Sequence, residues 1–236
     1  MDEPLKVQRH AGVTTITMDD GKANVMSVRM LQSLHRVLEQ ARQDDTMVVL
    51  TGRTGMFSGG FDLAVFKREP AEVLLMLTEG ARLTERLLRF PRPVLAVCTG
   101  HAIAMGAFVL LCADVRIGVD HGARFQANEV QIGMTLPRFA IETLRLRLSP
   151  AQLQLAAATA LPYSPLQAMA AGFLDELTPE SGLAEAVRIQ LDRLGKLDPK
   201  AFAATKQRLR EPTLNALRQA IDADIAEWTA RMKPGA

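Results

Sequence analysis

The stretch that decides the fold runs from Thr99 to Pro137 and reads TGHAIAMGAFVLLCADVRIGVDHGARFQANEVQIGMTLP. It is rich in Gly and Ala up to Ala107 and bulky and apolar just beyond, which predicts a tight turn that opens a buried helix. A helix beginning near Met105 presents N–H groups that lack intrahelical acceptors, and such groups attract developing negative charge. The Met105 N–H is therefore a candidate half of an oxyanion hole.

Glu129 lies in the same stretch, about twenty residues after Met105. It stands between a polar and an apolar residue, in a segment flanked by Gly122 and Gly133. If its carboxylate points into the cavity that the Met105 N–H faces, it can act as a general base. The alternative interpretation is a surface carboxylate at the end of a strand.

A second glycine-rich segment, TGRTGMFSGGFDLAVF, occupies residues 51–66. Gly59 and Gly60 allow the chain to turn sharply, so the Phe61 N–H can face inward at the start of a helix whose first turn holds Asp62. The alternative is a simple left-handed turn that closes a strand-loop-helix unit. The segment matches neither the phosphate-loop nor the dinucleotide-binding pattern.

Short apolar strands and amphipathic helices alternate along the rest of the chain. We expect strands at residues 5–9, 13–18, 47–50, 94–98, 114–119 and 123–126, and helices at 28–41, 72–90, 138–148, 150–159 and 165–171. Ser27 and Ser149 are the expected N-caps of two of these helices, and Gly172 is expected to end the last one. Residues 120–122 are the expected turn between the last two strands. Helical patterns dominate from residue 183 onward, with expected breaks at Asp198-Pro199 and Glu211-Pro212. The apolar faces of these last helices exceed what one core edge covers, so we expect self-association.

Composition narrows the class of protein. With 236 residues, 48% hydrophobic and 23% charged, the chain is long enough for one large globular domain with a sizeable core. The net charge of +2 gives no electrostatic footprint for nucleic acid. Cys98 and Cys112 lack metal-ligand spacing, which favours buried thiols in a reducing compartment and no metal site. The N-terminus resembles no secretory signal, so we expect a cytoplasmic protein.

Residues 93–115 are almost free of charge and approach the length of a membrane span. Thr99-Gly100-His101 interrupts them and is better explained as a turn between a buried strand and a buried helix. We therefore expect no membrane insertion. His101 is expected to be a turn or core-edge residue rather than a catalytic one.

Four ordered motifs resemble the crotonase superfamily, that is, the enoyl-CoA hydratase/isomerase family. They are FSGGFD at residues 57–62, PVLAVCTGHAIAMGAF at 93–108, CAD at 112–114 and NEVQIGMTLP at 128–137, and the resemblance extends over nearly the whole chain. It implies an α/β fold: a crotonase-type spiral of ββα units with two near-perpendicular sheets over residues 1–182. A C-terminal helical trimerisation region over residues 183–236 would follow.

The resemblance also implies an acyl-CoA thioester substrate, whose enolate-like intermediate accepts hydrogen bonds from two backbone N–H groups. By match these belong to Phe61 and Met105, with Glu129 as the catalytic carboxylate. No separate cofactor is implied, since coenzyme A is part of the substrate, and the expected assembly is a homotrimer or a dimer of trimers. The candidate pocket residues are Gly60, Asp62, Gly106, Phe108, Pro137 and Glu142. The basic residues Lys206 and Arg208 are candidates for contact with the CoA phosphates.

The chain departs from the family pattern at one catalytic position. Family hydratases place two glutamates, which fall here on Phe108 and Glu129. Adding water to a double bond is easiest with two carboxylates, and Phe108 cannot supply one. A Δ3,Δ2-enoyl-CoA isomerase needs a single base, which takes a proton from C2 and returns it at C4. The pattern also favours Gly at Ala104 and Met105 and Pro at Asn128; the Met105 side chain leaves its N–H in place but narrows the acyl pocket.

Three functions remain open at this point. The residues favour an isomerase with Glu129 as its single base. A 2-enoyl-CoA hydratase would need a second carboxylate, for which Glu142 is the first candidate. A catalytically silent acyl-CoA binding subunit would keep the oxyanion turns and would not need Glu129.

Overall fold

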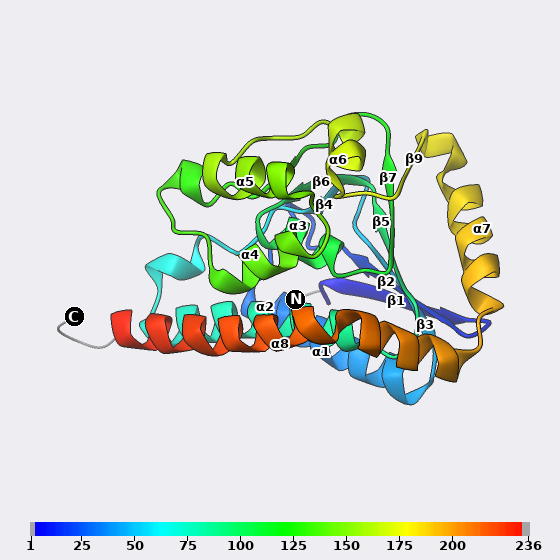
Figure 1. Cartoon of the computed structure of the whole chain (residues 1–236), viewed down its shortest axis with the longest axis horizontal. Helices are drawn as coiled ribbons and strands as arrows, with labels where there is room; N and C mark the ends of the chain where they lie inside the picture. Colours follow the sequence, from blue (N-terminus) through cyan, green and yellow to red (C-terminus); the bar gives the residue numbers. More distant parts are fainter. Residues whose placement is uncertain (1–2, 233–236) are drawn as a thin grey trace.

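The computed structural model describes residues 3–232 as an α/β fold with two sheets and a long C-terminal helix (Figure 1). Residues 1–2, at the start of the predicted spiral region, and residues 233–236, at the end of the predicted C-terminal helical region, lie outside the described residues. The larger sheet has the order β1 (Leu5–His10), β2 (Val13–Met18), β3 (Met47–Thr51), β5 (Val94–Cys98), β7 (Val115–Val119) and β9 (Glu176–Thr178). The smaller sheet holds β4 (Gly55–Ser58), β6 (Gly100–Ile103) and β8 (Phe125–Gln126).

The helices follow the strands in a regular order. They are α1 (Val28–Gln43), α2 (Pro70–Arg89), α3 (Met105–Leu111), α4 (Arg138–Arg145), α5 (Pro150–Thr159), α6 (Pro165–Ala171), α7 (Leu183–Gly195) and α8 (Pro199–Arg231), with short 3-10 helices η1 (Val65–Lys67), η2 (Val130–Ile132) and η3 (Glu180–Gly182). Three successive turns of the chain each give one strand to the large sheet, the next to the small sheet, and then a helix: β3-β4-α2, β5-β6-α3 and β7-β8-α4. This is the predicted spiral of ββα units.

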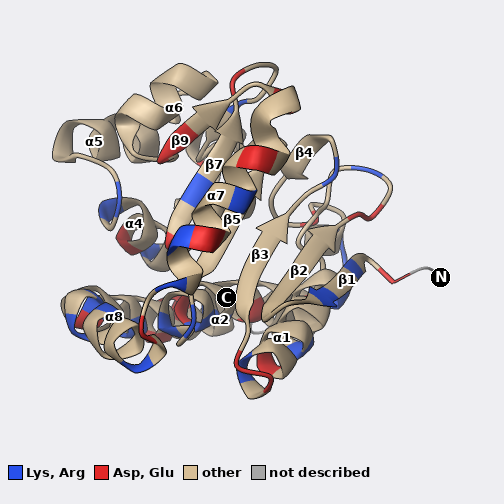
Figure 2. Ribbon diagram, turned by 90° about the vertical axis from the view of Figure 1, so that its right-hand side faces the viewer, with Lys and Arg blue, Asp and Glu red and all other residues tan. Residues whose placement is uncertain are grey.

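Side chains of the large sheet alternate between two apolar layers. Val48 and Leu50 on β3 face the main core, while Val49 joins a smaller cluster with Ile117 and with Ala186 of α7. Helix α7 therefore covers one face of the sheet, and α1, α2 and α8 lie on the other side (Figures 1 and 2). Lys and Arg residues are interspersed with Asp and Glu on the outer surfaces of α1, α7 and α8 (Figure 2), as expected for solvated helix faces.

Several local predictions are confirmed. The Ser27 hydroxyl accepts a hydrogen bond from the Met30 N–H at 3.2 Å and caps α1. Ser149 caps α5 in the same way, and Gly172, in the left-handed region with φ 105°, ends α6. The two cysteines are buried free thiols, and burial raises the pKa of each to about 12.

Two strands of the small sheet, β4 and β6, were not expected from the local sequence. Residues 55–58 were predicted as loop and form β4, and the predicted turn Thr99-Gly100-His101 reduces to Thr99, because Gly100 and His101 begin β6. Each strand has only two to four residues and its partner lies far along the chain, so no alternating pattern announces it. The turn expected at residues 120–122 does join β7 to β8, but these two strands belong to different sheets.

Two helix predictions need correction. No α-helix begins at Phe61; the chain instead turns at Asp62, whose carboxylate accepts the Ala64 N–H at 3.0 Å, and enters η1. The predicted break at Pro212 does not occur, because α8 continues through it. A proline inside a helix costs about 3 kcal/mol, and packing of α8 on either side offsets it: Leu217 is fully buried, and the Arg210 guanidinium donates to the Leu88 carbonyl at 3.0 Å.

Helix α3, which lies next to the candidate site, begins at Met105, as predicted, and all its residues are buried.

No helix among residues 3–232 is both long and apolar enough to cross a membrane.

Candidate active site

A small cavity of about 50 Å3 lies where the loop after β4, the turn before α3 and the segment around η2 meet. It is lined by Gly59, Phe61, Leu63, Phe66, Ala104, Asn128, Glu129, Ile132 and Met134. The two glycine-rich segments singled out from the sequence therefore form two of its walls. Leu63 and Ile132 are about half exposed, which places the mouth of the cavity on their side.

The loop after β4 and the start of α3 touch each other at Gly60. This residue has φ +94°, and a Cβ built on it would lie 2.8 Å from the Ala104 Cβ and 3.4 Å from the Met105 nitrogen. Only glycine permits this backbone conformation together with so close an approach. The contact brings the main chain of Phe61, the next residue, to the first turn of α3.

Backbone hydrogen bonds fix both segments. The Gly60 carbonyl accepts the Met26 N–H at 2.7 Å, and the Ala104 N–H donates to the Gln126 carbonyl at 2.8 Å. Ala104 has φ 49°, a conformation rare for a residue with a side chain. Neither the Phe61 N–H nor the Met105 N–H donates a hydrogen bond to any acceptor among the described residues, so both donors remain available to a ligand.

Glu129 contributes the carboxylate of the cavity. It immediately precedes η2, is 6% exposed, and its Oε2 atom has no hydrogen-bond partner among the described residues. Burial in these surroundings raises the pKa of Glu129 to about 7, because removal from water disfavours the charged form. The Met134 N–H donates to the Glu129 carbonyl at 2.9 Å and closes the segment back on itself.

Two of the predicted pocket residues on α3 lie elsewhere. Phe108 is 1% exposed and packs edge-to-face on Phe139, with ring centroids 6.0 Å apart. Gly106 faces the Ser58 main chain, where a Cβ would meet the carbonyl oxygen at 2.5 Å. Neither lines the cavity, because the side chains of this buried helix pack into the core instead.

Three further candidate pocket residues, Asp62, Pro137 and Glu142, do not line this cavity. Asp62 caps its own turn, as described above, and Pro137 precedes α4. Glu142, the candidate second carboxylate, pairs with Arg145 one turn along α4 at 3.4 Å. His101 lies on β6 rather than in a turn, with its Nδ1 buried and without a partner in the described part of the chain.

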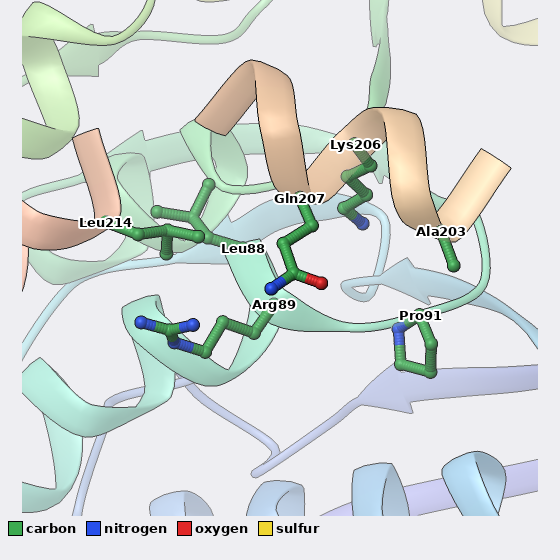
Figure 3. Close-up of a pocket in the computed structure, with 7 residues that line it drawn as sticks. All are labelled: Leu88, Arg89, Pro91, Ala203, Lys206, Gln207 and Leu214. Carbon is green, nitrogen blue, oxygen red and sulfur yellow. The ribbon is translucent and has the colours of Figure 1, made fainter. Parts of the chain in front are cut away.

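Lys206, a candidate for contact with the CoA phosphates, has a charged partner within the chain. It is 7% exposed, and its ammonium binds Asp114 at 2.7 Å, next to Arg210, which binds the same carboxylate at 2.8 Å. Burial lowers the pKa of Lys206 to about 8. Figure 3 shows Lys206 and Gln207 extending from α8 toward the end of α2. The predicted Arg208 is exposed.

A larger hollow of about 240 Å3 lies at this junction of α2 and α8 (Figure 3). Its buried ionisable group, Lys206, is already neutralised by Asp114. The smaller cavity differs because its carboxylate is unpaired. No group of three or more His, Cys, Asp or Glu residues between residues 3 and 232 is arranged to hold a metal ion.

Sequence reasoning missed the apolar side chains of the cavity: Leu63, Phe66, Ile132 and Met134. Each of the four lies two to five positions after a candidate site residue named from the sequence, either Phe61 or Glu129. They could have been found by treating each glycine-rich turn together with the short apolar segment after it.

Comparison with known proteins agrees with this geometry. The family model described as enoyl-CoA hydratase/isomerase matches residues 8–233. The apo structure of the Mtb enoyl-CoA isomerase is 40% identical, with 96% of this chain and 100% of that chain covered and a TM-score of 0.91. An enoyl-CoA hydratase from Mycobacterium marinum is also 40% identical, with 95% and 99% covered and a TM-score of 0.90.

A more distant relative is the mitochondrial enoyl-CoA delta isomerase 1 of Homo sapiens, which is 26% identical over 225 residues, or 93% of this chain and 74% of that protein. Names of both reactions thus occur among the relatives. The family match extends over the ββα spiral, the cavity and the C-terminal helices. The chain belongs to the enoyl-CoA hydratase/isomerase family and is an enzyme of that family.

Proposed function

We propose that this enzyme is a Δ3,Δ2-enoyl-CoA isomerase in which Glu129 is the single base. The observation that carries the proposal is the composition of the cavity: within the described residues, Glu129 is the one carboxylate that lines it. The other lining side chains are apolar, apart from the neutral amide of Asn128. One titratable group suits a reaction that moves one proton.

The reaction follows from these groups. The Glu129 carboxylate takes a proton from C2 of a 3-enoyl thioester, and the electron pair released makes a dienolate. Its oxygen accepts hydrogen bonds from the N–H groups of Phe61 and Met105, which stabilise the negative charge as it develops. The Glu129 carboxylic acid then returns the proton at C4. The double bond moves from position 3 to position 2, and no atom is gained or lost.

The pKa of Glu129 suits this exchange. A base works best when its pKa lies near the working pH, because it must accept the proton and release it again. Burial brings the pKa of Glu129 to about 7, so near neutral pH both the carboxylate that accepts the proton and the acid that returns it are accessible.

The contacts at the two positions where a second carboxylate would be expected argue against hydration. A hydratase shares proton removal and delivery between two carboxylates, yet Phe108 is packed on Phe139, and Glu142 is paired with Arg145 outside the cavity. A silent binding subunit is disfavoured by Glu129 itself. Burying an unpaired carboxylate costs free energy, and a protein that only binds acyl-CoA gains nothing from that cost.

The decisive comparison uses the wild-type enzyme with 3-enoyl-CoA and 2-enoyl-CoA substrates of equal length. We expect kcat/KM for isomerisation to exceed that for hydration by about two orders of magnitude, the usual contribution of one positioned acid-base group. Hydration as fast as isomerisation would mean that a second group acts as the missing acid, and the isomerase assignment would fall.

We also propose that the chain self-associates, as the family resemblance implies. Ile189 on α7, Leu197 just after it and Leu209 on α8 are exposed, and Leu209 is 78% exposed. Apolar side chains on adjoining helices gain from mutual burial between subunits. Light scattering at micromolar concentration should give a mass above that of one chain, and a monomer would contradict the proposal.

A further inference from the structure

The middle of α2 contains a glycine, Gly80, ten residues from the first residue of the helix. Glycine is among the least favourable residues in a helix interior, so its presence there needs a local reason. A Cβ built on Gly80 would lie 2.5 Å from Cε1 and 2.6 Å from Cζ of Phe61. The Phe61 ring therefore rests directly on the backbone of α2, and any larger residue would push it away.

A second side chain lies close to the same point of α2. The Met105 sulfur lies 3.5 Å from the point where the Gly80 Cβ would stand, and Met105 is fully buried at the start of α3. The tip of the Phe61 ring thus lies against Gly80 of α2, close to the Met105 side chain at the start of α3. The Phe61 main chain is tied by the bridge to Met26, so both ends of the residue are fixed.

Phe61 also lines the cavity. Leu63 and Ile132 mark the open side, whereas Phe61 is partly buried and packs on the main core. At about 50 Å3, the cavity is well below the roughly 300–1,000 Å3 of ordinary ligand pockets. A cavity of this volume suits short acyl chains better than long ones.

We infer that the Phe61 side chain, seated on Gly80, closes the acyl end of the pocket and makes the enzyme selective for short-chain acyl-CoA thioesters. This inference rests on the proposed function for the position of the thioester. Gly80 is then a positioning residue that acts through Phe61. The Phe61 side chain sets chain length, while its N–H serves the reaction.

The test measures binding, so it does not depend on turnover. Saturated acyl-CoA thioesters of two, four, six, eight and twelve carbons are titrated into the full-length enzyme by calorimetry. For the wild type, affinity should rise from two to four carbons and stop rising from six onward. In Phe61→Ala it should continue to rise to at least eight carbons, by about fourfold for each methylene buried.

Gly80→Ala should act in the opposite direction. Its new methyl group pushes the Phe61 ring toward the cavity, so the four-carbon thioester should bind at least about fivefold more weakly, with little change for the two-carbon one. The double variant should behave like Phe61→Ala, because no ring remains to be pushed. Gly195→Ala is the matched control: Gly195 also lies in a helix, but its Cβ would meet nothing closer than the Met47 Cε at 3.8 Å, and it should match the wild type.

Two results would overturn the inference: a wild-type affinity that rises steadily to twelve carbons, or a length profile that Phe61→Ala leaves unchanged. The second measurement carries the test even if Gly80→Ala does not fold. Failure of the proposed function is recognised separately, as a wild type that shows this short-chain binding profile but isomerises no 3-enoyl-CoA.

Discussion

Two carboxylates with little exposure to solvent, Glu129 and Asp114, have opposite surroundings. The Asp114 side chain is 12% exposed and binds Lys206 at 2.7 Å, Arg210 at 2.8 Å and the Val94 N–H at 2.8 Å. Glu129 is 6% exposed, and its Oε2 has no partner among residues 3–232. Burial of a charge is tolerated when it is paired. The unpaired carboxylate retains its cost of desolvation, which is also what makes it a stronger base for a bound substrate.

The two carboxylates also differ in what they connect. Asp114 lies just before β7, and its cationic partners come from α8, more than ninety residues later in the chain. It therefore anchors the long C-terminal helix to the spiral. Glu129 is held by hydrogen bonds within its own short segment, such as that from the Met134 N–H to its carbonyl. We therefore expect substitution of Asp114 to reduce mainly stability and substitution of Glu129 to reduce mainly activity.

The largest expected effect is on catalysis. Glu129→Gln keeps the shape of the side chain and removes its basicity, so kcat for isomerisation should fall by up to about four orders of magnitude. Steady-state kinetics with a 3-enoyl-CoA measure the fall. Binding of a saturated acyl-CoA should stay within a few-fold of the wild type, because the N–H groups of Phe61 and Met105 are unchanged.

Glu142→Gln is the matched control, since it removes a carboxylate from α4 that pairs with Arg145 outside the cavity. Its kcat/KM should stay within about twofold of the wild type, because an exposed ion pair contributes little. A loss comparable to that of Glu129→Gln would restore Glu142 as a second acid.

The next effect is on stability. Asp114→Asn leaves the charges of Lys206 and Arg210 buried without a counter-charge, which should lower the free energy of unfolding by about 3–5 kcal/mol. Urea unfolding of this variant, of Glu129→Gln and of the wild type gives the comparison. If Asp114→Asn unfolds at the same urea concentration as the wild type, the network does not hold α8 in place.

The smallest effect is the pH dependence of stability. The pKa of Glu129 rises from 4.5 to about 7 on folding, so between these values the native state binds more protons than the unfolded state. The free energy of unfolding should therefore decrease as pH rises through this window, by about 3 kcal/mol in total at ~1.4 kcal/mol per pH unit.

Urea titrations between pH 4.5 and 8 isolate this contribution as the difference between the wild type and Glu129→Gln. The free energy of unfolding of the wild type should decrease relative to that of Glu129→Gln as pH rises, and the difference should level off above about pH 7. A difference that does not vary with pH would show that the carboxylate is solvated or paired in solution.

The sequence allowed accurate predictions where the signal is local. The Ser27 cap, the strand at residues 94–98 and the start of α3 at Met105 each depend on a few neighbouring residues. Glu129 was identified as a candidate because it lies in a motif, and the structure adds its burial and its free oxygen.

Predictions failed where the determinant is distant in the chain. Strands β4 and β6 are short and are stabilised by pairing with each other, and α8 continues through Pro212 because of its packing on other helices. Lys206 was a candidate for CoA contact because of its charge and the family resemblance, and its pairing with Asp114 joins residues that no sequence pattern connects. The seat of Phe61 on Gly80 is of the same kind.

The most direct test of a single buried base follows the proton itself. The wild-type enzyme is given a 3-enoyl-CoA that carries deuterium at C2, and the 2-enoyl product is analysed by mass spectrometry and NMR. Glu129 is 6% exposed, so the deuterium it removes should be returned before water exchanges it, and a measurable fraction should appear at C4. A product whose C4 carries only hydrogen from solvent would contradict proton transfer by one shielded carboxylate.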